Sequence, residues 1–149
     1  MYAKSSFDDN CDLKNYPRPH NVMPNGCDSN NPISFDISLF NKDFITFING
    51  FADKVNRKGG EIFYSFAPMN ASAISYVELQ KAESFYDFLD NALDFKIISN
   101  VEDYIMESEW FYDSNYHLND SGMTVRTVKL VNDIKTELGN STKTECVLP

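Results

Sequence analysis

The sequence contains few of the residues that build metal sites, disulfide frameworks or nucleic-acid interfaces. It has 3 cysteines and 2 histidines among 149 residues, and the cysteines are far apart. An odd number of widely spaced cysteines supplies neither a disulfide framework nor a zinc site, so we expect no structural metal. Only 13 basic residues oppose 22 acidic ones, for a formal net charge of −9. Binding to phosphates needs clustered positive charge, and we therefore expect no nucleic-acid partner.

Long apolar runs are also absent from the sequence. No run approaches the roughly 20 residues that a membrane-spanning helix needs. The first ten residues, MYAKSSFDDN, contain no apolar segment of the kind found in signal peptides. We therefore expect neither a membrane span nor a signal peptide in this chain, and the sequence leaves its compartment open. What the chain does have is aromatic residues, 14% of the total, which are enough to build the core of one domain.

The composition divides the chain into three parts. Residues 1–33 are polar and rich in asparagine, aspartate and proline, which is typical of an irregular arm or connection. Residues 34–139 carry regular apolar patterns and form the expected domain. Residues 140–149 are a polar tail.

Within residues 34–139, helix-like and strand-like patterns alternate. They predict a helix from residue 41 to Gly59-Gly60, a strand over 61–67, a helix over about 71–92, a strand over 95–99 and a helix that begins near Asn119. Strands that alternate with helices predict an α/β fold, in which helices cover both faces of a parallel sheet. Two strands are few for such a sheet, so we expect the domain to be incomplete on its N-terminal side.

Polar residues follow both predicted strands. In a parallel sheet, functional side chains gather at the carboxyl ends of the strands. Met69 and Asn70 follow the first strand, and we predict that they bind substrate. The loop after the second strand contains Asp113 and, four residues later, His117. A carboxylate bonded to one ring nitrogen of a histidine fixes the tautomer that acts as a general base, and Asp113 is close enough in sequence to His117 to do so from a turn. The alternative interpretation is a plain turn without chemistry.

The segment FYDSNYHLN (111–119), followed by Gly122 and an amphipathic helix, resembles the last conserved block of the SGNH (GDSL-type) hydrolases. The segment GGEIFYSFAPMN (59–70) resembles a late strand of the same family, and the resemblance spans about residues 35–139. It implies a three-layer α/β/α sandwich of flavodoxin-like layout, and ester hydrolysis or acyl transfer without a metal or cofactor. It also implies that His117 is the general base, that Asp113 orients it, and that the substrate is an acyl ester such as an acetylated carbohydrate.

The chain departs from the pattern of this family at two points. The family spacing is Asp-x-x-His, whereas three residues separate Asp113 from His117, and Asp120 is the alternative orienting carboxylate. The family's Gly-Asp-Ser block, which supplies the serine nucleophile, is not found. Its nearest match, GCDS (26–29), is interrupted by a cysteine and follows no apolar strand. We therefore do not expect Ser29 to be a nucleophile, and Ser5 and Ser6 have no supporting context.

Three interpretations are compatible with these patterns. In the first, the chain is the C-terminal portion of an SGNH-type ester hydrolase or acyltransferase, and it does little chemistry on its own because the nucleophile and the oxyanion hole are missing. In the second, it is a catalytically inactive binding or assembly module that pairs with another chain, either a second copy or a complementing partner. In the third, it is a complete small esterase that uses Ser29 from the arm. We favour the first as an account of family and architecture.

Overall fold

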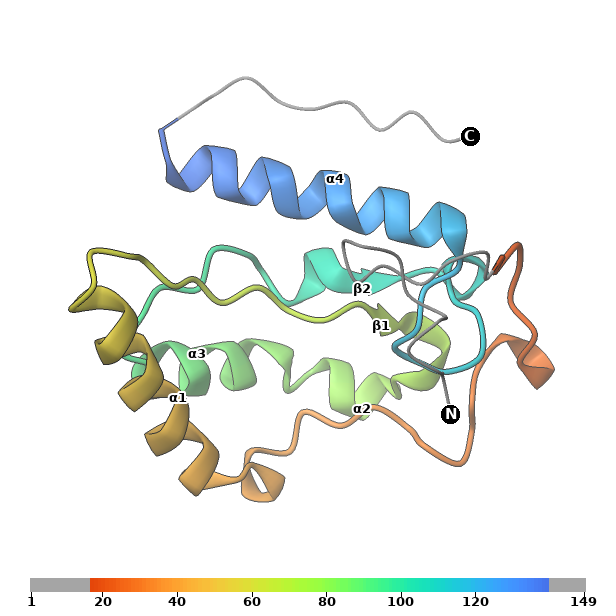
Figure 1. Cartoon of the computed structure of the whole chain (residues 1–149). Coiled ribbons are helices and arrows are strands. Elements are labelled where there is room, and N and C mark those ends of the chain that lie inside the picture. The colour runs from red at the N-terminus through yellow and green to blue at the C-terminus, as the bar shows by residue number, and fades with distance from the viewer. Residues whose placement is uncertain (1–16, 140–149) are drawn as a thin grey trace, which may run out of the picture.

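The computed structural model describes residues 17–139, and these adopt a mixed α/β fold (Figure 1). Within them, four α-helices accompany a sheet of two parallel strands: α1 (Lys42–Asn56), β1 (Met69–Asn70), α2 (Tyr76–Leu79), α3 (Ala82–Ala92), β2 (Ile105–Met106) and α4 (Asp120–Glu137). Residues 1–16 of the expected arm, with Ser5 and Ser6, and residues 140–149 of the expected tail lie outside the described residues.

The two segments predicted as strands, 61–67 and 95–99, are extended and run parallel. Tyr64 N–H donates to the carbonyl of Lys96 at 2.9 Å, and Ile98 N–H donates to the carbonyl of Tyr64 at 2.9 Å. These bonds make one parallel bridge, and regular pairing begins only at β1 and β2, where Met69 lies opposite Ile105. The parallel α/β arrangement is therefore confirmed, whereas the regular strands lie further along the chain than predicted.

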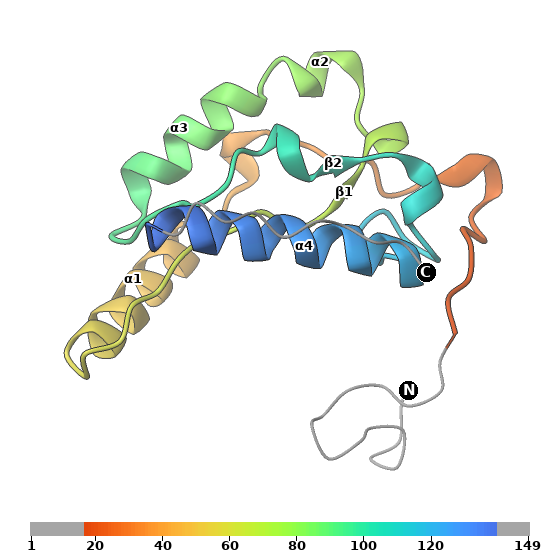
Figure 2. The ribbon, with the colours of Figure 1, turned by 90° about the horizontal axis from the view of Figure 1, so that it is seen from above.

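Helices lie on both sides of the paired segments. In Figure 1, α4 lies above them and α2 and α3 lie below them. Viewed from above in Figure 2, α4 runs along the pair, and α1 stands at one end of the molecule, where the chain turns into segment 61–67. The buried core fills the space between these elements and consists of Ile33, Phe35, Phe66, Met69, Ala73, Ala82, Leu89, Ile97, Val101 and Tyr104.

The first and last predicted helices are confirmed. In α1 the side chain of Asn41 caps the first turn, and Gly59, at φ +77°, follows the helix in the left-handed conformation that glycine adopts without strain. In α4 the side chain of Asn119 accepts from Gly122 N–H at 2.8 Å, as expected of an N-cap.

The helix predicted over 71–92 is interrupted, and here the prediction was wrong. A 3₁₀ turn (Ala71–Ala73) comes first and is followed by α2 and α3. Asn70 and Ser75 each cap a separate start with their side chains. Between these caps, Ile74 is extended and forms a parallel bridge with Ile33. Because a residue held in β geometry cannot continue a helix, the chain has to start again at Ser75.

The hydroxyl of Tyr104 joins the sheet side of the core to α4. Tyr104 is fully buried, and its hydroxyl donates to the Asp133 carboxylate at 2.7 Å. Burial raises the pKa of Tyr104 to about 12. The folded protein therefore holds the Tyr104 proton more tightly than the unfolded chain does. This stabilisation is present below about pH 10 and is lost as the pH rises toward about 12.

The change Tyr104→Phe should reduce stability by about 1–2 kcal/mol at neutral pH, because it removes a hydrogen bond to a carboxylate. It should also flatten the loss of stability between pH 10 and pH 12, because the titrating group is gone. Urea unfolding followed by circular dichroism measures both effects. Tyr76→Phe, on a side chain that is 77% exposed, is the matched control and should change neither. An unchanged alkaline slope in Tyr104→Phe would assign that slope to other groups.

Candidate active site

Asp113 and His117 lie in a tight turn between two buried residues. Phe111 and Leu118 form an antiparallel bridge, and Tyr112 N–H donates to the carbonyl of His117 at 2.8 Å. Phe111 is 0% and Leu118 6% exposed, and Val125 of α4 packs against their cluster. Burial of its two flanking residues fixes the turn at the N-terminal end of α4.

The side chains of Asp113 and His117 form a hydrogen bond. The distance from His117 Nδ1 to Asp113 Oδ1 is 2.9 Å, and the side chains are 67% and 46% exposed. A carboxylate at Nδ1 favours the tautomer in which Nδ1 carries the proton, which leaves the Nε2 lone pair available as a base. Within residues 17–139, His117 Nε2 has no hydrogen-bond partner. The pair therefore has the geometry of a general base and its orienting group, on a histidine side chain that is largely exposed.

Asn115 lies in the turn between Asp113 and His117, and its side chain is buried. It points inward, is 2% exposed, and its amide accepts from Asp28 N–H at 2.9 Å. The same amide donates at 2.8 Å to the carbonyls of both Asp28 and Asn31. These bonds tie the turn to the arm, and Asp113 and His117 meet on the exposed side of the same turn. Sequence reasoning missed this residue, since asparagine between two polar neighbours looks like ordinary turn chemistry.

The described part of the arm packs against this turn. Besides the contacts with Asn115, Val22 N–H donates to the carbonyl of Tyr112 at 2.8 Å. Asn21 also bridges two segments, because its amide donates to the carbonyls of Gly26 and Ser108 at 2.8 and 2.6 Å. The arm is irregular, as predicted, up to the bridge that Ile33 forms with Ile74. Asparagine side chains and the backbone of neighbouring segments satisfy several of its backbone groups.

The residues predicted to bind substrate lie behind the turn. Met69 is 6% and Asn70 0% exposed. Asn70 N–H donates to the carbonyl of Asn115 at 3.0 Å, and its side chain donates to the carbonyl of Gly26 at 2.8 Å. In this arrangement Asn70 ties the end of β1 to the turn and to the arm. Direct contact of Met69 and Asn70 with substrate stays a prediction.

Asp120, the alternative orienting carboxylate, has other partners. One carboxylate oxygen accepts from Arg18 N–H at 3.0 Å, and the other lies 3.8 Å from Arg18 Nε. Asp120 N–H in turn donates to the Arg18 carbonyl at 3.0 Å. Asp120 therefore ties the arm to the start of α4, and Asp113 is the carboxylate that contacts His117.

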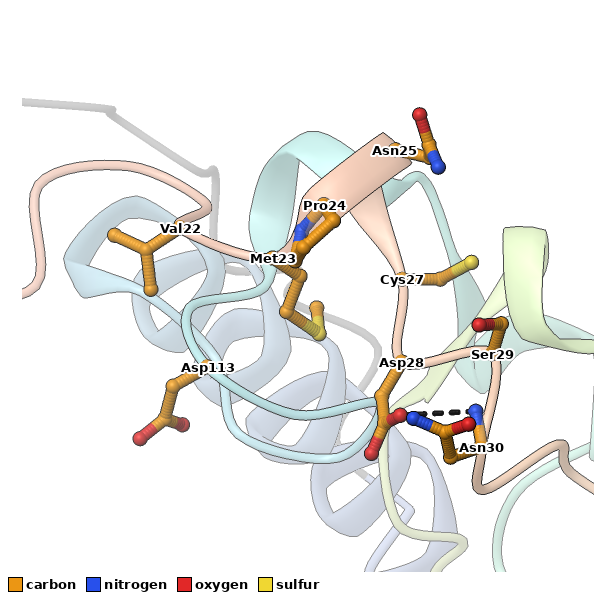
Figure 3. A pocket seen from close by; sticks show the side chains of 9 residues that line it. All are labelled: Val22, Met23, Pro24, Asn25, Cys27, Asp28, Ser29, Asn30 and Asp113. Atoms are coloured by element: carbon orange, nitrogen blue, oxygen red, sulfur yellow. Dashed lines mark hydrogen bonds between the residues drawn. The ribbon is translucent and has the colours of Figure 1, made fainter.

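A cavity of about 260 Å³ lies beside the turn (Figure 3). It is lined by Val22, Met23, Pro24, Asn25, Cys27, Asp28, Ser29, Asn30 and Asp113. Asp113 lies on one side of it, whereas Cys27 and Ser29 lie on the other side, and the Cys27 side chain points away from Asp113 (Figure 3). Among residues 17–139, no hydrogen bond joins Ser29 to His117. The described contacts therefore give Ser29 no base.

Two further observations concern residues 17–139 alone. No group of three or more histidine, cysteine or acidic side chains among them is arranged to hold a metal ion. None of their helices combines the length and the apolar character needed to cross a membrane.

Comparison with protein-family models, with curated proteins and with solved structures finds no match to this chain.

Proposed function

We propose that this chain supplies the general base and its orienting carboxylate to an ester-hydrolysing or acyl-transferring site of the SGNH type. The observation that carries the proposal is the 2.9 Å hydrogen bond between His117 Nδ1 and Asp113 Oδ1, combined with an Nε2 that has no hydrogen-bond partner among the described residues. In this proposal the domain is the C-terminal portion of a three-layer α/β/α sandwich. The presence of helices on both sides of the parallel segments supports that architecture (Figure 1).

In this proposal, His117 Nε2 transfers the proton during ester cleavage. His117 Nε2 removes a proton from water or from a hydroxyl nucleophile as its oxygen adds to the ester carbonyl carbon. Asp113 stabilises the resulting imidazolium, and the same proton passes from His117 to the leaving alkoxide when the tetrahedral intermediate collapses. Suitable substrates are acyl esters, including acetylated carbohydrates. No described serine is hydrogen-bonded to the imidazole ring of His117, and Ser114 Oγ accepts only from the His117 backbone N–H, at 3.1 Å. In this proposal the nucleophile therefore lies elsewhere or is water.

Hydrolysis of an activated ester, p-nitrophenyl acetate, tests the proposal. We expect the folded chain to hydrolyse it slowly but above the buffer rate, because His117 can activate water when no other nucleophile is in place. A folded chain that leaves the buffer rate unchanged would contradict this proposal.

The same negative result would favour a second candidate function, a catalytically inactive assembly module. The observation behind this candidate is an aromatic face of α1 that no described residue covers. Phe44, Phe47 and Phe51 are 50%, 69% and 47% exposed. Contiguous exposed apolar patches mark interaction surfaces on proteins.

A further inference from the structure

Helix α1 has apolar residues on two sides, and the described chain buries only one of them. One side, with Ile45 and Ala52, packs into the protein, and Asn49 on that side donates to the carbonyl of Ala92 at the end of α3 at 2.9 Å. At 3.6 residues per turn, Phe44, Phe47 and Phe51 form a stripe on roughly the opposite side from Asn49. We call these three residues the aromatic stripe. It faces away from α3 and is exposed.

The strand segment that follows α1 has one open edge. Tyr64 uses both its backbone groups on the neighbouring segment 95–99. The alternate residues Phe63, Ser65 and Ala67 direct their backbone groups the other way, because successive residues of a strand hydrogen-bond to opposite neighbours. Among the described residues, those three N–H groups and three carbonyls have no hydrogen-bond partner. Such an edge accepts another extended strand.

The open edge and the aromatic stripe together are self-complementary. The three open residues are centred on Ser65, so a two-fold axis beside Ser65 would pair it with its own counterpart and Phe63 with the counterpart of Ala67. Strands related in this way are antiparallel, and the sheet continues from one copy into the next. An axis perpendicular to the sheet keeps the two α1 helices on the same face of the joined sheet, where their exposed aromatic stripes can meet.

The charge near this edge permits two copies to meet. Residues 37–67 carry four basic and three acidic side chains, so this part of a chain with net charge −9 is close to neutral: Lys42, Lys54, Arg57 and Lys58 against Asp43, Asp53 and Glu61. The negative charge that would repel a second copy lies on the rest of the molecule. The aromatic stripes alone would bury roughly 300 Å² per copy. Two copies thus supply about half of the ~1,200 Å² at the lower limit of specific interfaces, and the strand edges add to it.

From these observations we propose that the chain forms a two-fold dimer through the edge of segment 61–67 and the aromatic stripe of α1. The occupant of this surface is a second copy of the chain. The proposal does not depend on the hydrolase chemistry, because His117 and Asp113 lie at the far end of the paired segments, next to β1.

Light scattering and hydrogen exchange on the whole chain test the dimer. We expect a particle of twice the chain mass of 17.1 kDa that dissociates on dilution. Amide exchange at Phe63, Ser65 and Ala67 should slow as the concentration rises, because these N–H groups become paired in the dimer. Phe47→Glu should give a monomer with an unchanged circular dichroism spectrum, since that side chain is 69% exposed in the single copy.

Val77→Glu is the matched control. Val77 is also an exposed apolar residue on a helix, at 65%, and its replacement should leave the dimer intact. Three results would each overturn the proposal: a monomer at every concentration, a dimer that resists Phe47→Glu, or exchange at the three edge residues that does not depend on concentration. A wild-type monomer that gains edge protection only with a different polypeptide would assign the edge to that partner instead.

Discussion

Replacing Gly122 with alanine should destabilise the protein by about 3 kcal/mol, the largest effect on stability expected of a single methyl group here. Gly122 is buried in the first turn of α4, where the backbone of Trp110 passes directly over it. A Cβ at this position would collide with the Trp110 carbonyl oxygen and lie 3.0 Å from the carbonyl carbon. Both obstacles are backbone atoms, so no rotation of a side chain relieves the clash.

The Gly122→Ala change should also disturb the site, because α4 can escape the clash only by moving away from Trp110. That movement would break the N-cap bond between Asn119 and Gly122 and loosen the turn that carries His117. Urea unfolding measures the loss of stability. Gly50→Ala is the control: a Cβ there has no atom within 4 Å, and Gly50 lies inside α1. That change should stabilise the protein by about 0.5–1 kcal/mol. Equal stability of Gly122→Ala and wild type would contradict the close approach.

Replacing His117 with alanine should remove the protein-dependent hydrolysis of p-nitrophenyl acetate, a loss of about 10²-fold relative to wild type. The reason is that His117 Nε2 is the proposed base, and nothing else in the described site replaces it. Asp113→Ala should lower the rate by at least about 10-fold, because the imidazole then loses its preferred tautomer and the charge that stabilises its protonated form. Both side chains are largely exposed, so neither change should unfold the protein.

Two controls separate this effect from unspecific hydrolysis. His20→Ala removes the other histidine, which is exposed, and should leave the rate unchanged. Ser29→Ala should also have no effect, because Ser29 has no hydrogen bond to His117. A rate that falls with Ser29→Ala as far as with His117→Ala would identify a complete esterase within this chain. Equal losses in His20→Ala and His117→Ala would remove the case for a specific site.

Local patterns predicted some elements of the fold well. The position of α1 between Asn41 and Gly59, and the start of α4 at Asn119, follow from capping residues that act within one helical turn. The break between the 3₁₀ turn (Ala71–Ala73) and α2 was not predictable in this way. It depends on Ile74, which pairs with Ile33, a residue that lies about forty positions away in the sequence.

The candidate site likewise combines local features that the sequence reveals with tertiary contacts that it does not. The spacing of Asp113 and His117 is a local feature, and the sequence identified the pair. The three asparagines that hold the turn in place, Asn70, Asn115 and Asn119, are buried and bonded to other segments. Only the tertiary structure distinguishes a buried, fully bonded asparagine from one in an exposed turn. For the same reason, Asp120 was an open alternative in the sequence, and the structure pairs it with Arg18.

The tautomer of His117 is the most direct test of the proposed base. Nitrogen-15 NMR of the imidazole distinguishes Nδ1–H from Nε2–H in the neutral ring, and His20 in the same spectrum serves as an exposed reference. The hydrogen bond from His117 Nδ1 to Asp113 predicts that His117 carries its proton on Nδ1, unlike His20, and that Asp113→Ala abolishes the difference. A wild-type His117 with its proton on Nε2 and a tautomer ratio equal to that of His20 would contradict the role of Asp113 as its orienting partner.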